Sequence, residues 1–154
     1  MLMTPLFKKM NFKAQKRIFV LNSPIEFANH IKEMEPFTKI SITSSAKEMH
    51  YVLLFAKNIE ELNALFAKVK DKLIDDVYLW VCFPKKSSRK YTSNITRDIG
   101  WDRLGEANYE PVKIVAVDEN WSALRFRKVS FIKQIKRSDK MILSKEGMKK
   151  KKGK

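Results

Sequence analysis

A chain of 154 residues with a hydrophobic share of 44% is long enough to bury one sizeable core, which indicates a single domain. Its single cysteine, Cys82, excludes an internal disulfide and is typical of a reducing, cytoplasmic setting. No run of residues has the length of a membrane span or the pattern of a signal peptide.

The net charge of +15 is concentrated at the two ends of the chain. Residues 1–17 carry +5, residues 133–154 carry +8, and residues 18–132 carry only +2. We therefore predict a basic N-terminal arm over 1–17, a single α/β domain over 18–132, and a basic, disordered tail over 133–154. Such a tail attracts a nucleic acid or another polyanion, which makes these possible partners, but the interpretation we prefer is a solubilising tail without a dedicated partner.

The first strand and the turn after it are the most informative stretch. Ile18–Leu21 is a continuous apolar run, which predicts a strand buried on both faces. Ser23, Pro24 and Glu26 then form the pattern of a capping box that begins a helix. Enzymes that bind dinucleotides keep glycines at this turn, so that the backbone approaches the cofactor closely, and glycine is absent here.

The rest of the chain alternates between strand and helix patterns. Proline and loop signals, apolar periodicity and a capping pattern at Asn58 predict, in order, a helix over 25–35, a strand over 39–44, a strand over 51–55, a helix over 58–73, a strand over 77–83, a helix over 94–104 and a hairpin of strands 112–117 and 122–128. This order favours helices packed on both faces of a mostly parallel sheet. Residues 45–50 are short for a parallel crossover, so the strand over 39–44 either runs antiparallel or has different boundaries.

Three motifs resemble a small uncharacterised bacterial family, a domain of unknown function, over about residues 5–130. They are Leu21-Asn22-Ser23-Pro24, Phe83-Pro84-Lys85-Lys86-Ser87 after Trp80, and Val117-Asp118-Glu119-Asn120-Trp121-Ser122-Ala123-Leu124-Arg125. The resemblance implies no established activity or ligand.

The strand and helix order is also similar, more distantly, to the Rossmann-like fold of methyl-donor-dependent methyltransferases, including their terminal antiparallel hairpin. This likeness implies a Rossmann-like three-layer sandwich. Two departures weigh against the activity: the glycine-rich turn is missing, and Thr43-Ser44-Ser45 stands where a ribose-binding carboxylate would follow the second strand.

Ligands of open α/β sheets bind outside the carboxyl ends of the strands. Loops that follow three of the predicted strands supply polar and basic side chains, which we expect to attract a phosphate, a carboxylate or a nucleic-acid backbone: Asn22, Ser23, Lys57, Asn58, Lys85, Lys86, Ser87 and Arg89. The alternative is that these serines and asparagines only cap helices.

A second set of residues could form an interaction surface: Trp101, Tyr109, Trp121, Arg125 and Arg127. For the three aromatic residues the alternative is packing in the core. No cluster of histidine, cysteine or acidic residues has the spacing of a catalytic or metal site, so we predict no catalytic residue, metal or cofactor. The preferred interpretation is a non-catalytic binding module for an anionic partner; a diverged methyltransferase-like enzyme and a protein interaction module are the alternatives.

Overall fold

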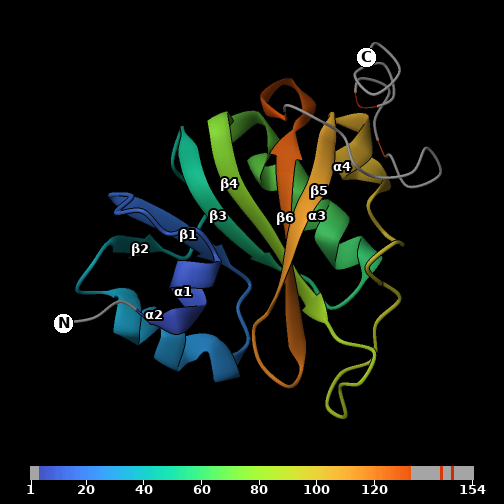
Figure 1. Cartoon of the computed structure of the whole chain (residues 1–154), viewed down its shortest axis with the longest axis horizontal. Helices are drawn as coiled ribbons and strands as arrows, with labels where there is room; N and C mark the ends of the chain where they lie inside the picture. The colour runs from blue at the N-terminus through green and yellow to red at the C-terminus, as the bar shows by residue number, and fades with distance from the viewer. Residues whose placement is uncertain (1–3, 133–142, 144–146, 148–154) are drawn as a thin grey trace.

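The computed structural model describes residues 4–132, 143 and 147, which build a six-stranded sheet with helices on both faces (Figure 1). The elements are α1 (Pro5–Lys9), β1 (Arg17–Leu21), η1 (Ile25–Phe27), α2 (Ala28–Met34), β2 (Lys39–Ser41), β3 (Met49–Phe55), α3 (Ile59–Val69), η2 (Lys70–Lys72), β4 (Leu73–Pro84), α4 (Asp102–Glu106), β5 (Tyr109–Ala116), β6 (Trp121–Lys128) and η3 (Val129–Phe131).

The strands follow the order β2-β1-β3-β4-β6-β5 across the sheet. β2, β1, β3 and β4 are parallel to one another, and β6 runs antiparallel to both of its neighbours, β4 and β5. The predicted fold class, a Rossmann-like α/β sandwich with a mostly parallel sheet and a C-terminal antiparallel hairpin, is confirmed.

The strand whose direction the sequence left open, β2, is parallel to β1. It has three residues, and Ser41 at its end lies level with Val52 in β3, through Phe19 of β1. From the level of Ser41 the chain must go back along the sheet by only three residues to begin β3 at Met49. It must also cross from β2 over β1 to β3, which is two strand spacings of about 4.8 Å each. Residues 42–48 can span this distance without a crossover helix, because β2 is so short.

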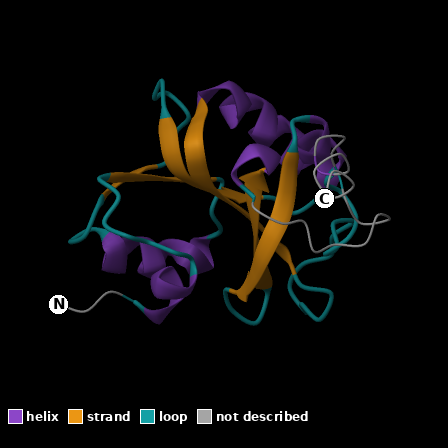
Figure 2. Cartoon of the chain, turned by 45° about the horizontal axis from the view of Figure 1, so that its top comes forward, coloured by secondary structure: helices purple, strands orange, loops and turns teal. Residues whose placement is uncertain are grey.

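Alternate residues of the central strands face two separate cores. Phe19 and Leu21 of β1 pack with α3 and α4, whereas Ile18 and Val20 pack with α1, η1 and α2. Figure 2 shows the two groups of helices on opposite sides of the sheet. The apolar runs predicted as strands buried on both faces thus form the middle layer of a three-layer sandwich.

The N-terminal segment differs from the predicted basic arm, since residues from Thr4 onward belong to the fold. α1 buries Leu6 and Phe7, and Met10 and Phe12 follow it into the same core. Lys8 and Lys9 stand between these apolar residues in the sequence and are exposed in the structure. Their charge obscured the helical pattern of the segment. The predicted tail lies outside the described residues, apart from Leu143 and Gly147.

The stretch before α4 also differs from prediction. The expected helix over 94–104 is reduced to α4, and residues 94–101 form an irregular loop in which Ile99 is 58% exposed. Gly105 lies inside α4, where an added Cβ would come within 2.5 Å of the Leu143 carbonyl oxygen. This glycine allows Leu143 to approach the helix.

Candidate functional site

Four connecting segments meet at the carboxyl edge of the parallel strands. β1, β3 and β4 are neighbours and end at Leu21, Phe55 and Pro84, so the loops after them lie at one edge. The hairpin turn joins them, because Trp121 at the start of β6 pairs with Pro84 at the end of β4. The predicted convergence of these loops is therefore present in the fold.

The turn after β1 is not a capping box. Ser23 makes no capping hydrogen bond, and the chain enters a short 3-10 turn whose N-cap is Pro24. Asn22 has a φ of 62°, a left-handed conformation that glycine adopts most readily and asparagine second. Asparagine thus supplies the backbone turn for which the sequence shows no glycine.

The Asn22 side chain bridges the ends of two adjacent strands. Its Nδ2 donates to the Phe55 carbonyl oxygen at 2.8 Å and to Glu61 Oε1 at 2.7 Å. The strand order reverses between β1 and β3, and this is the point where open sheets of this class bind ligands. Here that crevice is spanned by the chain's own polar groups.

The N-terminus of α3 is likewise satisfied from within the chain. Asn58 is its N-cap, as predicted, with Oδ1 accepting from the Glu61 amide at 2.8 Å. Asn94 Oδ1 accepts from the Ile59 amide at 2.9 Å, and Glu61 Oε1 accepts from the Lys57 amide at 3.1 Å. These contacts favour the alternative interpretation for Asn58, because its helix start already has oxygen partners.

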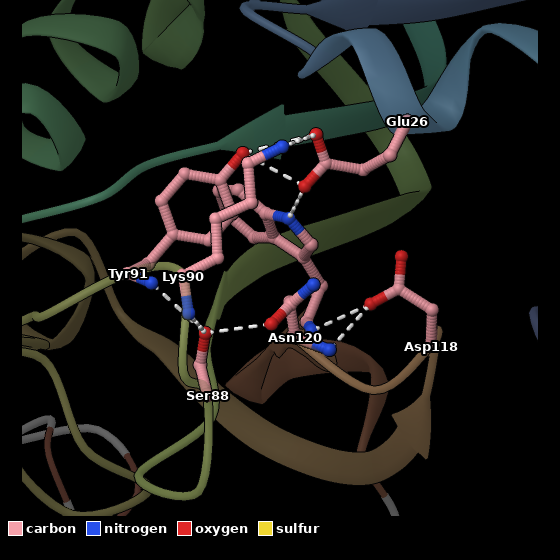
Figure 3. A network of polar contacts seen from close by, with 7 residues as sticks. Glu26, Ser88, Lys90, Tyr91, Asp118 and Asn120 are labelled. Carbon is pink, nitrogen blue, oxygen red and sulfur yellow. Dashed lines mark hydrogen bonds and ion pairs between the residues drawn. The ribbon is translucent and has the colours of Figure 1, made fainter.

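The loop over residues 85–91, here called the basic loop, is held to the hairpin turn by a network of hydrogen bonds (Figure 3). The Lys85 amide donates to the Asn120 carbonyl at 2.8 Å, and Ser88 Oγ donates to Asn120 Oδ1 at 2.8 Å. Ser88 Oγ also accepts from the Tyr91 amide at 3.0 Å. In the hairpin turn, Asp118 Oδ1 accepts from the amides of Asn120 and Trp121. The basic loop and the hairpin turn are therefore both held in a defined conformation.

Glu26 joins the basic loop to the opening turn. Its carboxylate accepts from the Tyr91 hydroxyl at 2.7 Å and from the Trp121 indole at 3.1 Å, and it pairs with Lys90 at 3.3 Å. In Figure 3 the tyrosine and the lysine reach across to this carboxylate. Glu26 is therefore a central anchor, rather than the helix-capping residue that its position predicted.

The electrostatics agree with a permanently ionised Glu26. Burial alone would raise the pKa of Glu26, but hydrogen bonds from Tyr91, from Trp121 and from its own backbone outweigh burial, with a smaller contribution from the ammonium group of the neighbouring lysine. Together they lower the pKa from its usual 4.5 to about 2. Burial, with Glu26 as its hydrogen-bond acceptor, raises the pKa of Tyr91, so its hydroxyl stays a donor.

The predicted anion-binding residues surround this anchored cluster. Lys57, Lys86 and Ser87 are exposed, Lys85 is half-buried, and the Lys57 ammonium lies 5.5 Å from the centre of the Tyr91 ring. A cavity of about 400 Å³ opens between the basic loop and the hairpin turn, lined by Ser87, Arg89, Lys90, Glu119 and Asn120. The anion-binding role of these residues stays a prediction.

The predicted interaction surface is divided by the structure. Trp101, Tyr109 and Trp121 are each 1% exposed, so they pack in the core and present no aromatic surface. Burial raises the pKa of Tyr109 to about 12. Arg125 and Arg127 lie on β6 and are partly exposed.

Glu26, Lys90, Tyr91 and Asn120 are the site residues that sequence reasoning missed. The partners of Glu26 lie 65 and 95 residues further along the chain, so no local pattern connects them. The one available signal was the polar run that begins after Pro84, which was interpreted only as a source of positive charge.

Residues 4–132 offer little support for a cysteine nucleophile or a metal site. Cys82 is buried in β4, where burial raises the pKa of its thiol and leaves it a poor nucleophile. The described part of the chain holds no group of three histidine, cysteine or acidic side chains that could hold a metal ion. It also holds no helix with the length and apolar character to cross a membrane.

Comparison with known proteins assigns the chain to no family. No family model and no curated protein sequence matches it, so membership in an uncharacterised family stays a prediction. Among solved structures it is similar to a predicted type 11 methyltransferase from Sulfolobus solfataricus (12% identity, 74% of this chain and 85% of that chain, TM-score 0.44). It is also similar to the N-methyltransferase NodS from Bradyrhizobium japonicum WM9 (15% identity, 73% and 74%, TM-score 0.38). These likenesses say nothing beyond the fold class, which the strand order already defines.

Proposed function

We propose that this protein uses a methyltransferase-like, Rossmann-type scaffold to bind a phosphorylated ligand at the carboxyl edge of its sheet, without catalysis. The basic loop would provide the binding groups, Lys85, Lys86 and Arg89, with Lys57 from the neighbouring strand end. The observation that carries the proposal is the anchoring of this loop: Ser88 and Tyr91 fix it on both sides. A loop that is already ordered loses less entropy when a ligand binds.

The methyl donor expected from such a fold does not fit the crevice as it stands. Ligands of such sheets bind at the switch point of the strand order, here between the ends of β1 and β3, and the Asn22 side chain crosses that gap to Phe55 and Glu61. Tyr91 occupies the neighbouring position beside Trp121, with ring centres 5.1 Å apart. We therefore derive no methyl-transfer step from this arrangement.

Ligand-dependent stabilisation separates the proposal from its alternatives. We expect millimolar pyrophosphate or a nucleoside triphosphate to raise the melting temperature of the full chain, because a ligand that binds only the folded state stabilises it. The Lys85→Ala/Lys86→Ala variant should lose that increase. As a matched control, Lys32→Ala/Lys39→Ala removes the same charge elsewhere in the fold and should retain the increase. An equal loss in both variants would contradict the proposal.

The strand order favours a second candidate, a diverged methyltransferase-like enzyme, and does so more directly than it favours a binding module. Binding of a methyl donor would then require the Asn22 bridge to open. A melting-temperature increase with S-adenosylmethionine, enlarged in Asn22→Gly, would support this candidate. No change at millimolar donor in either protein would exclude it.

A further inference from the structure

A second cluster of positive charge lies on the sheet face that carries Trp80 and Cys82. It is formed by Lys113 of β5, Arg125 and Arg127 of β6, and Tyr78 of β4, and is called the basic sheet face below. Lys113 is exposed, and the other three residues are partly exposed. Its nearest helical cover is the end of α1, where Lys113 Nζ donates to the Lys9 carbonyl oxygen at 2.7 Å.

Two cations of this face lie directly opposite each other in the sheet. Lys113 and Arg125 are register partners in the antiparallel β5–β6 ladder. Like charges at directly opposite positions destabilise a sheet, because the side chains of such a pair are neighbours. A bound anion between them would reverse this repulsion.

The two arginines of the face differ in their partners. Arg127 is neutralised by Asp76, with Nε to Oδ1 at 2.8 Å and Nη2 to Oδ2 at 2.5 Å. Arg125 instead stacks on the ring of Tyr78, with its guanidinium carbon 4.3 Å from the ring centre, and its Nε has no hydrogen-bond partner among the described residues. Burial, and the charge of Arg127 to a smaller extent, lower the pKa of Arg125. Arg125 is thus held in one orientation by the Tyr78 ring, and the Asp76 carboxylate acts on it only through the longer-range attraction of its charge.

The residues around Arg125 indicate what kind of partner would fit. On β6 its neighbours on the same face are Ala123, which is fully buried, and Arg127. A protein partner would need an apolar centre, which these positions do not offer. Guanidinium and ammonium groups on an extended surface suit the phosphates of a nucleic-acid backbone.

We propose that the basic sheet face binds the phosphodiester backbone of a nucleic acid, with Arg125 and Lys113 as the contacting residues. The Tyr78 ring is covered by Arg125, so it is not available for base stacking, and binding is independent of sequence. This site is separate from the carboxyl edge, and the inference does not depend on the proposed function.

The test measures binding of the full chain to a fluorescein-labelled 20-nucleotide poly(U) by anisotropy, over a series of salt concentrations. For Arg125→Gln/Lys113→Gln we expect a five- to tenfold weaker affinity at 100 mM salt. The slope of log affinity against log salt should fall by about 1.4, since each lost phosphate contact on a single strand contributes about 0.7. The matched control is Lys68→Gln/Lys70→Gln, which removes two exposed charges on the α3 side and should change the affinity less than twofold.

Equal losses in the two double variants would overturn the proposal, because only net charge would then matter. The single variant Lys113→Gln changes an exposed side chain and keeps the test valid if the arginine variant unfolds. In Lys113→Gln the slope of log affinity against log salt should fall by about 0.7, which is half of the fall expected for the double variant. A slope equal to that of the wild type would contradict the proposal. Labelled polyglutamate is the second probe: if it binds as tightly as poly(U) and is equally weakened by Arg125→Gln/Lys113→Gln, the partner is an acidic protein and the nucleic-acid proposal is wrong.

Discussion

Replacing Glu26 by glutamine tests the anchor of the candidate site most sharply. Glutamine keeps the size and one acceptor oxygen, but removes the charge that Tyr91, Trp121 and Lys90 stabilise. The fall in pKa from 4.5 to about 2 corresponds to roughly 3 kcal/mol in the free energy of unfolding. Because the carboxylate side chain is 22% exposed, solvent screens part of this, and we expect Glu26→Gln to lose about half of it, roughly 1.5 kcal/mol, at pH 7.

The difference in the free energy of unfolding between wild type and Glu26→Gln should depend on pH. A carboxyl whose pKa is lower in the folded state contributes its full stability above the unfolded pKa of 4.5, and that stability is lost as the pH falls towards 2. The difference between wild type and Glu26→Gln should therefore shrink to roughly half or less at pH 3. Urea unfolding followed by circular dichroism at pH 7 and pH 3 measures it.

The control is Glu33→Gln, an exposed acid in α2, which should change the free energy of unfolding by no more than about 0.5 kcal/mol at either pH. A Glu26→Gln difference that is the same at pH 7 and pH 3 would refute the reasoning, because it would then come from packing rather than from charge.

Three further predictions concern single positions. Asn22→Ala should destabilise the protein by about 1–2 kcal/mol and Asn22→Gly by less, since alanine is strained at a φ of 62°; equal losses in urea unfolding would show that only the hydrogen bonds matter. Phe7→Ala should cost about 3–4 kcal/mol in the same assay, because this ring is fully buried, and a loss under about 0.5 kcal/mol would mean that α1 is an undocked arm. Gly105→Ala should give no gain in thermal stability, because the new Cβ would meet the Leu143 carbonyl; a gain of about 1 kcal/mol, usual for alanine in a helix, would mean that Leu143 does not dock there.

The parts of this fold that sequence reasoning predicted are those set by local patterns. The apolar runs of β1, β3 and β4 were long enough to mark strands buried on both faces, and Asn58 capped its helix as expected. Once those strands are parallel neighbours, the meeting of their loops at one edge follows from geometry.

The parts that could not be predicted depend on distant contacts. The capping-box pattern at Ser23 and Glu26 was a sound local signal. The Glu26 carboxylate instead accepts from three donors, Tyr91, Trp121 and Lys90, which bind it more strongly than one backbone amide would. The segment over 1–17 was misassigned for a related reason. Its apolar residues find their cover on β3 and β4, where Tyr51 and Trp80 both donate to the Met10 carbonyl.

The central claim is that the carboxyl edge holds an anion at the basic loop and no methyl donor at the opening turn. Backbone amide shifts in two-dimensional NMR, recorded during titration with pyrophosphate and separately with S-adenosylmethionine, test it directly. We predict that pyrophosphate shifts the amides of residues 85–90, and that the methyl donor leaves Asn22 and Ser23 unchanged. Saturable shifts at Asn22 and Ser23 with the methyl donor, and none in the basic loop with pyrophosphate, would contradict the account.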